Sequence, residues 1–200
     1  VIISFMTQVN IIAILSNFNT GIPLIISERT YPPKFRLSFI WELLRFLTYP
    51  FADMVVMQTL QGLNWLNGNI KKAKGISIPN PVQKPIANTT PHIQVESIIG
   101  PDVKLCIVVA RLVKDKGLEG IIESFHNSLS ENSSWNLVFL GNGEERDYLS
   151  DLAERRNLED KIFFLGRTGN LHDWYERADL FVLNSKVEGF PNSLLEAMSY

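Results

Sequence analysis

The sequence predicts an α/β fold in two lobes, each built on a parallel sheet flanked by helices. Apolar runs of four to seven residues alternate with amphipathic stretches of helical period, and this alternation is typical of βα units. The pattern occurs twice, on either side of a segment at 78–101 that holds five prolines and almost no periodicity. These observations favour two lobes joined by a connector over one continuous sheet.

The elements follow from the same pattern. In the first half we expect strands and helices in alternation, the strands at 1–4, 23–27, 53–57 and 75–78 and the helices near 6–16, 36–48 and 59–68. In the second half we expect strands at 105–110, 136–141, 162–166 and 180–184, with helical faces marked by apolar residues at 118–129, 148–153 and 171–178. The turn at 17–21 is a plausible stop for the first helix.

The connector sets the expected domain boundaries. We predict a first lobe at 1–85, a linker at 86–100 and a second lobe at 101–200. The chain begins inside an apparent strand and stops about one turn into a helix, so we expect a fragment in which both lobes are incomplete. The carboxyl ends of two such sheets would face a shared crevice, which is where open α/β folds bind ligands.

Composition narrows the class of protein. With 46% hydrophobic and 20% charged residues, the chain can bury a core, and we expect a soluble protein without a transmembrane helix or signal peptide. The single cysteine, Cys106, lies in an apolar run, which excludes a disulfide framework and fits a reducing compartment. The three histidines lack metal-ligand spacing, so we predict no metal site and no cofactor.

The segment EGFPNSLLE, from Glu188 to Glu196, is the most informative for chemistry. A strand, a glycine turn and a new helix start would direct backbone N–H groups into a cleft that favours an anion such as phosphate. Arg111 follows another strand, and Lys116 comes five residues later, before a glycine. Their charges suit a diphosphate, although a pair of solvated loop charges is the simpler interpretation of these two alone.

Four segments in this order, ARLVKDKG, FLGNGEE, FFLGR and EGFPNSLLEAM, resemble the retaining glycosyltransferases of family 4. The resemblance covers nearly the whole chain and implies the GT-B fold, two Rossmann-like lobes with the acceptor bound by the first and the nucleotide-sugar donor by the second. It implies that Arg111 and Lys116 bind the donor diphosphate and that Glu188 faces the sugar. The implied donor-site set also includes Gly141, Arg167, Gly189, Phe190, Asn192, Ser193 and Glu196.

Glu196 and Arg167 each have a second interpretation, and the glycines at 141–143 need a separate one. By the resemblance Glu196 would hold the ribose hydroxyls, whereas its spacing from Ser193 also fits a capping box at a helix start. The GNG at 141–143 lacks the third glycine of a dinucleotide fingerprint, so we expect a close-packed turn there. Arg167 would lie near the base, or would be part of an ordinary surface turn.

In the first lobe, Ser27, Glu28 and Arg29 end a strand and resemble the acceptor side of polysaccharide and lipid-linked oligosaccharide transferases. A structural Glu28–Arg29 pair is the alternative. Residues 1–94 carry eight lysines and arginines against three acidic residues, while 95–200 carry eleven against eighteen. The basic first lobe, with the aromatic stretch 34–51, could rest on an anionic membrane, although a helix with its apolar side in the core fits that stretch too.

The resemblance therefore implies a metal-independent retaining enzyme. It would move a hexose or N-acetylhexosamine, with uridine the expected base, from a nucleotide diphosphate sugar to a growing lipid-linked glycan. We expect a cytoplasmic protein, peripheral on the membrane face, with no nucleic acid partner. Two alternatives are a catalytically silent nucleotide- or partner-binding domain and a dinucleotide-dependent oxidoreductase, which would require a complete GxGxxG.

Overall fold

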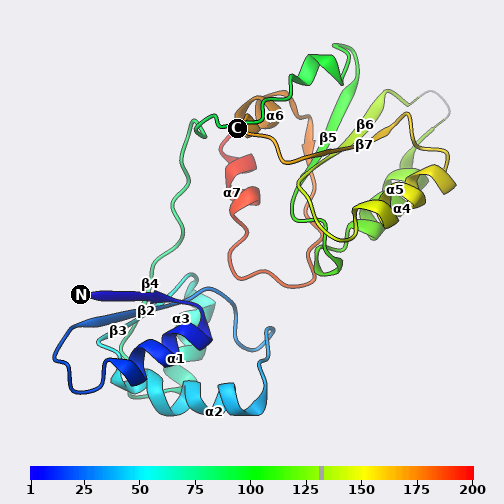
Figure 1. The fold of residues 1–200 in the computed structure, drawn as a ribbon. Helices are drawn as coiled ribbons and strands as arrows, with labels where there is room; N and C mark the ends of the chain where they lie inside the picture. Colours follow the sequence, from blue (N-terminus) through cyan, green and yellow to red (C-terminus); the bar gives the residue numbers. More distant parts are fainter. Residues whose placement is uncertain (131–132) are drawn as a thin grey trace. The chain divides into compact units, whose positions relative to one another are not determined.

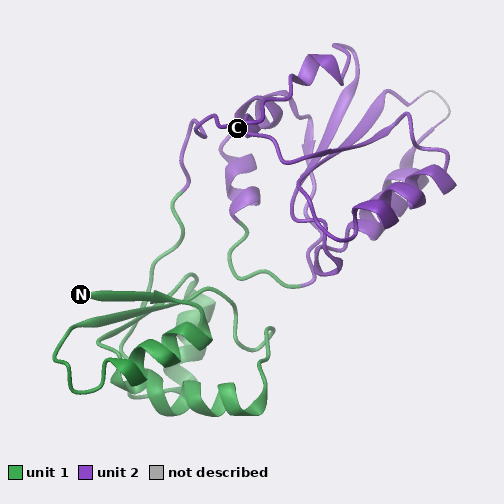
Figure 2. Ribbon diagram, in the orientation of Figure 1, with its two compact units in different colours: residues 1–81, 187–191 green, residues 82–186, 192–200 purple. Residues whose placement is uncertain are grey.

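The computed structural model describes residues 1–130 and 133–200, and it divides into two compact units. Unit 1 comprises residues 1–81 and 187–191, and unit 2 comprises residues 82–186 and 192–200 (Figure 2). The chain thus returns to unit 1 for five residues before its last helix. Each unit is described by itself.

Unit 1 is a four-stranded parallel sheet in the order β1-β2-β3-β4 (Figure 1). Three connections join successive parallel strands, and each of them contains a helix. The elements are β1 Ile2–Phe5, α1 Thr7–Ser16, β2 Leu24–Glu28, α2 Phe39–Thr48, a 3₁₀ turn Tyr49–Phe51, β3 Met54–Met57, α3 Leu60–Asn69 and β4 Gly75–Ser77. Helices α1 and α2 pack against each other.

The core of unit 1 comes from the apolar positions that defined its pattern. Ile11 and Ile14 of α1, Ile26 of β2 and Val55 of β3 are all buried in one cluster. Helix α1 stops where the sequence indicated, because Asn19 and Gly21 both adopt positive φ in the turn that follows it. The expected strands and helices of this half are confirmed, with ends shifted by up to three residues.

Unit 2 contains a second parallel sheet, in the order β7-β6-β5-β8, with helices between its strands (Figure 1). A crossover from β7 to β8 places β8 beside β5, so that β5 becomes an inner strand. The elements are a 3₁₀ turn Val95–Ser97, β5 Lys104–Val109, a 3₁₀ turn η3 Lys114–Lys116, α4 Leu118–Ser128, β6 Trp135–Leu140, α5 Arg146–Arg155, β7 Ile162–Gly166, α6 Leu171–Arg177, β8 Leu180–Phe181 and α7 Asn192–Met198.

Both faces of this sheet are covered, as expected for parallel strands with continuous apolar runs. Alternate residues of β5 point to opposite clusters: Cys106 and Val108 pack with the cluster that includes α4 and α5, and Leu105 and Ile107 pack with Trp174 of α6. Burial raises the pKa of the Cys106 thiol to about 11. The cysteine is therefore an uncharged core residue at neutral pH.

Two parts of unit 2 differ in detail from the sequence pattern. The strand expected at 180–184 is confined to Leu180–Phe181, although Val182 still donates its backbone N–H to the Ile107 carbonyl. Residues 82–100 belong to unit 2, where Val95 and Ile99 are buried in the core. In the described part of the chain, no helix is long and apolar enough to cross a membrane.

Candidate functional site

Three of the predicted donor residues meet at one edge of the unit 2 sheet. Arg111 follows β5, Gly141 follows β6 and Arg167 follows β7, and these strands are neighbours. A cavity of about 300 Å³ lies at their carboxyl ends, lined by Val109, Ala110, Arg111, Leu140, Gly141, Asn142, Arg167, Thr168 and Leu171. Both arginines are exposed, so the cavity combines an apolar floor with two cations at its rim.

The loops after β5 and β6 are joined by backbone hydrogen bonds. Leu112 donates its N–H to the Asn142 carbonyl at 3.0 Å, and Glu145 donates to the Leu112 carbonyl at 2.9 Å. Gly141 has φ of 147°, and a Cβ at this position would lie 2.0 Å from the Ala110 carbonyl oxygen. The close-packed turn expected around Gly141 is confirmed, and it holds the backbone of the residue just before Arg111.

Replacing Gly141 by alanine should therefore disturb the cavity directly. Its methyl group cannot fit against Ala110 unless the two loops separate, and we expect a loss of about 1–3 kcal/mol in the free energy of unfolding. Chemical denaturation would measure this loss. Gly68 in α3 has nothing within 4 Å of its would-be Cβ, so Gly68→Ala is the control and should not destabilise the chain. Equal stability of the two variants would contradict the packing described here.

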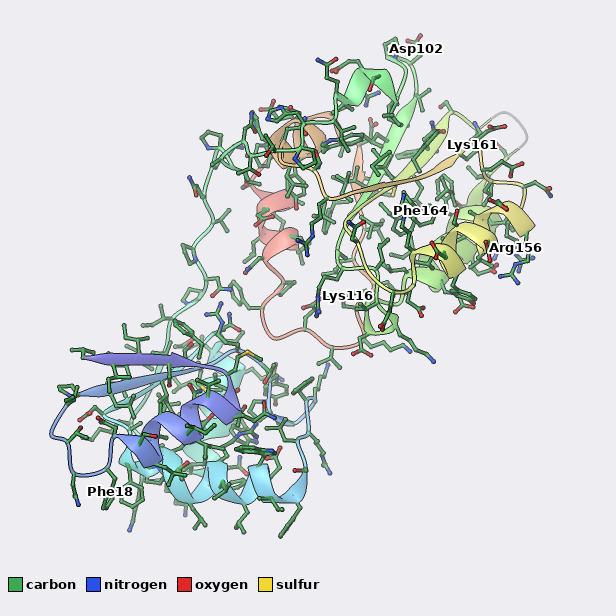
Figure 3. The ribbon with its side chains drawn as sticks, viewed as in Figure 1. Phe18, Asp102, Lys116, Arg156, Lys161 and Phe164 are labelled. Atoms are coloured by element: carbon green, nitrogen blue, oxygen red, sulfur yellow. The ribbon has the colours of Figure 1, made fainter. Side chains whose placement is uncertain are left out.

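Lys116 lies in the loop that joins β5 to α4 (Figure 3), and it is half-buried. It is outside the group of residues that line the 300 Å³ cavity. The following residue, Gly117, adopts a left-handed conformation with φ of 62°, and its carbonyl accepts a hydrogen bond from the Asn184 side chain at 2.9 Å. Lys186 also donates its N–H to the Asp115 carbonyl at 2.9 Å, so the segment after β8 is fixed to the Lys116 turn.

The EGFPNSLLE segment is divided between the two units. Glu188, Gly189 and Phe190 belong to unit 1, whereas Asn192, Ser193 and Glu196 belong to unit 2. Gly189 lies against the loop after β2, where a Cβ would come within 2.4 Å of the Arg29 carbonyl oxygen. A glycine is therefore required for this close approach of two backbones.

Glu196 lies in α7 and has a hydrogen-bond partner that the sequence did not suggest. The Tyr175 hydroxyl of α6 donates to Glu196 Oε2 at 3.1 Å and lies 3.3 Å from the Ser193 carbonyl oxygen. Helix α7 begins at Asn192, so Ser193 is already inside its first turn. The capping-box interpretation, which needs Ser193 at the position before the helix, does not fit this geometry.

On unit 1, Glu28 ends β2 and is 2% exposed. Its carboxylate accepts hydrogen bonds from Thr7 at 2.8 Å and Tyr49 at 2.6 Å, and its Oε2 lies 3.6 Å from Arg45 Nε. The alternative of a Glu28–Arg29 pair is thus replaced by a Glu28–Arg45 pair. The Arg29 guanidinium instead lies over the Phe5 ring, 5.7 Å from its centroid.

Arg45 is itself fully buried in α2. Its Nη1 donates to Glu42 at 2.8 Å and its Nη2 donates to Thr7 at 3.1 Å. Burial and the neighbouring Glu28 carboxylate raise the pKa of Tyr49, which stays a neutral donor. Ser27, also buried, contributes its carbonyl to the same region and accepts from the Asn10 side chain at 2.9 Å. These residues form an internal polar network at the carboxyl end of β2.

Sequence reasoning missed Tyr175 and Arg45 as partners of the predicted site residues. Tyr175 lies on the apolar face of the short helix expected at 171–178, and a buried tyrosine hydroxyl needs a hydrogen-bond partner. Arg45 falls within a helix rich in apolar residues, and an arginine buried in such a helix signals a carboxylate partner. Among the described residues, no group of three or more histidine, cysteine or acidic side chains is placed to hold a metal ion.

Comparison with known proteins identifies the family. A family model described as "Glycosyl transferases group 1" matches residues 90–200, more than half of the chain. The chain therefore belongs to the group 1 glycosyltransferases, and the resemblance inferred from the four motifs is confirmed. Because the chain belongs to this family, we do not retain the alternative of a dinucleotide-dependent oxidoreductase.

Two relatives come from Campylobacter jejuni. One, named GalNAc-α-(1→4)-GalNAc-α-(1→3)-diNAcBac-PP-undecaprenol α-1,4-N-acetyl-D-galactosaminyltransferase, is 27% identical over 201 residues, covering 100% of this chain and 53% of the relative. The other, an N-acetylgalactosamine-N,N'-diacetylbacillosaminyl-diphospho-undecaprenol 4-α-N-acetylgalactosaminyltransferase, is 28% identical over 209 residues, covering 98% and 54%. The chain spans about half the length of these relatives.

Solved structures agree on the fold. Anabaena HepE in complex with UDP superimposes with a TM-score of 0.78 at 18% identity, covering 98% of this chain and 57% of that one. Sucrose-phosphate synthase from Thermosynechococcus elongatus gives 0.78 at 16% identity, covering 98% and 53%. The fold is GT-B, as the family resemblance implied.

Proposed function

We propose that this chain is part of a retaining glycosyltransferase that moves a hexose or N-acetylhexosamine from a UDP-sugar to a growing lipid-linked glycan. One observation carries the proposal: the family match covers unit 2, where Arg111, Gly141 and Arg167 surround one cavity at the sheet edge. Support for the acceptor comes from the Campylobacter relatives, whose names specify undecaprenyl diphosphate-linked glycans. Support for uridine comes from the UDP bound to HepE.

In this proposal unit 2 binds the donor. Arg111 and Lys116 bind the diphosphate, Arg167 lies near the base, and Glu196 accepts hydrogen bonds from the ribose hydroxyls. Gly141 is needed so that its backbone can pack against Ala110 and shape the cavity that we propose holds part of the donor. The remaining proposed donor contacts come from the EGFPNSLLE segment: Asn192 and Ser193 belong to unit 2, and Glu188, Gly189 and Phe190, which precede them in the chain, are grouped with unit 1.

During the proposed transfer, negative charge develops on the departing diphosphate and positive charge develops on the sugar. The bond between the anomeric carbon and the diphosphate oxygen breaks, the acceptor oxygen attacks from the same face, and its proton passes to the departing diphosphate. Arg111 and Lys116 stabilise that diphosphate, and Glu188 fixes the sugar hydroxyls as positive charge develops. Two protein cations neutralise the leaving group, so we propose that transfer needs no metal ion.

A transfer assay tests the proposal. The protein is incubated with a radiolabelled UDP-hexose or UDP-N-acetylhexosamine and undecaprenyl diphosphate-linked oligosaccharides, with and without EDTA. We expect label in the lipid fraction, an α-linked product by NMR and no loss of rate with EDTA. Nucleotide binding without any transfer would instead support the catalytically silent domain.

Unit 1 is proposed to bind the acceptor side, through the strand end that carries Ser27, Glu28 and Arg29. Because Glu28 is buried among Thr7, Tyr49 and Arg45, its proposed contribution is to hold this strand end in place. Of the three residues only Arg29 is partly exposed, so we propose that Arg29 is the one that contacts the acceptor.

Unit 1 also presents an apolar surface on α2. Arg45 and Thr48 face the interior, whereas Phe39, Ile40 and Leu47 are 79%, 67% and 57% exposed. The alternative that the apolar side of this helix is core therefore does not hold for these residues. The surface, which we call the α2 face, consists of Phe39, Ile40, Leu43 and Leu47, and the exposed cations Lys34 and Arg36 precede it. Apolar side chains beside cations fit an anionic lipid surface, so we propose a peripheral protein on the cytoplasmic membrane face.

Vesicle flotation measures this docking. We expect the protein to float with phosphatidylglycerol vesicles and to remain in the bottom fraction with phosphatidylcholine vesicles. Replacing Phe39, Ile40 and Leu43 by serine should abolish flotation, because each removes apolar area that would enter the lipid. The control is Leu60→Ser with Met198→Ser, which removes side chains 71% and 75% exposed on other elements. Self-association through the α2 face without lipid binding would contradict the proposal.

A further inference from the structure

Tyr175 stands out in unit 2 because its polar group is directed at a proposed donor residue. The residue is 5% exposed on α6, and its hydroxyl reaches Glu196 Oε2 at 3.1 Å. The Ser193 carbonyl oxygen, one helical turn earlier, is 3.3 Å away. Tyr175 thus contacts α7 at two points, both close to the carboxylate that we propose binds the ribose.

The tyrosine ring is held in place by other aromatic residues. It stacks on Tyr200 with ring centroids 5.6 Å apart and planes 12° from parallel, and Phe181 of β8 lies 6.1 Å away. Burial, followed by the nearby Glu196 carboxylate, raises the pKa of Tyr175, so the hydroxyl stays protonated at physiological pH. A fixed, protonated hydroxyl can only donate to the carboxylate, since an ionised carboxylate is acceptor-only.

We propose that Tyr175 is a positioning residue that orients the Glu196 carboxylate for the ribose and thereby sets the preference for ribonucleotides over deoxyribonucleotides. This inference rests on the proposed donor site. A carboxylate has two oxygens and about four acceptor positions, so the Tyr175 bond at Oε2 leaves capacity for ribose hydroxyls. Without the tyrosine hydroxyl the Glu196 side chain is still present but loses the contact that fixes its orientation.

Removal of the Tyr175 hydroxyl should affect binding only through the ribose of the nucleotide. A site built to hydrogen-bond a hydroxyl discriminates against the analogue that lacks it, because its polar group is then left unpaired. Discrimination of this kind needs the acceptor at a fixed position. Loss of orientation should therefore weaken binding of the ribonucleotide and leave the deoxyribonucleotide nearly unaffected.

The test is calorimetric titration of UDP and 2′-deoxy-UDP into the protein and its Tyr175→Phe variant. The wild-type protein should prefer UDP, and the variant should bind UDP about tenfold more weakly while its affinity for 2′-deoxy-UDP changes less than about twofold. Tyr148→Phe is the matched control, because Tyr148 is 41% exposed on α5 and the neighbouring carboxylate of Glu119 raises the pKa of its hydroxyl. This control should keep the wild-type ratio of affinities for UDP and 2′-deoxy-UDP.

Glu196→Gln completes a double-mutant cycle. If Tyr175 acts through Glu196, adding Tyr175→Phe to Glu196→Gln should change the UDP to 2′-deoxy-UDP ratio little further. UDP binding by the wild-type protein with an unchanged ratio in Tyr175→Phe would overturn this inference alone, as would equal loss of both nucleotides. Binding of neither nucleotide by the wild-type protein would overturn the proposed donor site and this inference with it.

Discussion

Replacing Arg111 and Lys116 by alanine together should weaken UDP binding by about 100-fold or more. Hydrogen bonds to charged groups contribute about 1.5–3 kcal/mol each, and a diphosphate left without cations loses at least two of them. Arg111 is exposed at the rim of the cavity, so its removal should change binding without unfolding unit 2. Calorimetric titration without metal measures the effect.

The matched control removes the same charge elsewhere on unit 2. Lys104 lies over the Trp135 ring and Arg156 pairs with Glu123 on the surface. Lys104→Ala with Arg156→Ala should bind UDP within about twofold of the wild-type protein, because these cations contact no proposed donor residue and surface charges are screened by salt. Equal weakening in both double variants would mean that net charge alone, and not a site at Arg111 and Lys116, attracts the nucleotide.

Breaking the buried ion pair of unit 1 should have the largest effect on stability. Arg45 and Glu28 have side chains 0% and 1% exposed, so Arg45→Ala leaves a carboxylate buried without its cation. The expected loss is about 3–5 kcal/mol in the free energy of unfolding. Denaturant unfolding followed by circular dichroism would measure it.

A surface pair provides the comparison for this prediction. Arg156 and Glu123, with side chains 44% and 32% exposed, are 2.9 Å apart, and Arg156→Ala should cost less than about 1 kcal/mol. A second variant, Glu28→Gln with Arg45→Met, removes both charges and should recover part of the loss. If Arg45→Ala were no more destabilising than Arg156→Ala, the buried network would not hold the end of β2.

Much of this architecture could be predicted because buried parallel strands are encoded by continuous apolar runs. The runs around Ile26, Val55 and Ile107 are continuously apolar, and each became a strand of one of the two sheets. Positions after strand ends could be predicted too, since parallel strands carry their carboxyl ends to one edge. The family resemblance had implied that Arg111, Gly141 and Arg167 belong to one site, and the three neighbouring strands bring them to the same cavity.

Other features depend on contacts that sequence spacing does not encode. The Tyr175–Glu196 bond joins residues from α6 and α7, and the Glu28–Arg45 pair joins β2 to α2. Nothing in either local pattern specifies the partner. For the α2 face the sequence left two alternatives open, because helical periodicity identifies an apolar side but does not decide whether residues such as Phe39 and Ile40 are core or exposed.

We propose that unit 2 carries a nucleotide-sugar donor site. Its most direct test is titration of UDP, with GDP in parallel, into the protein in the absence of metal ions. The proposal predicts saturable binding of UDP that the Arg111→Ala/Lys116→Ala variant loses. Absence of binding by either nucleotide, or equal binding of UDP by the variant, would contradict it.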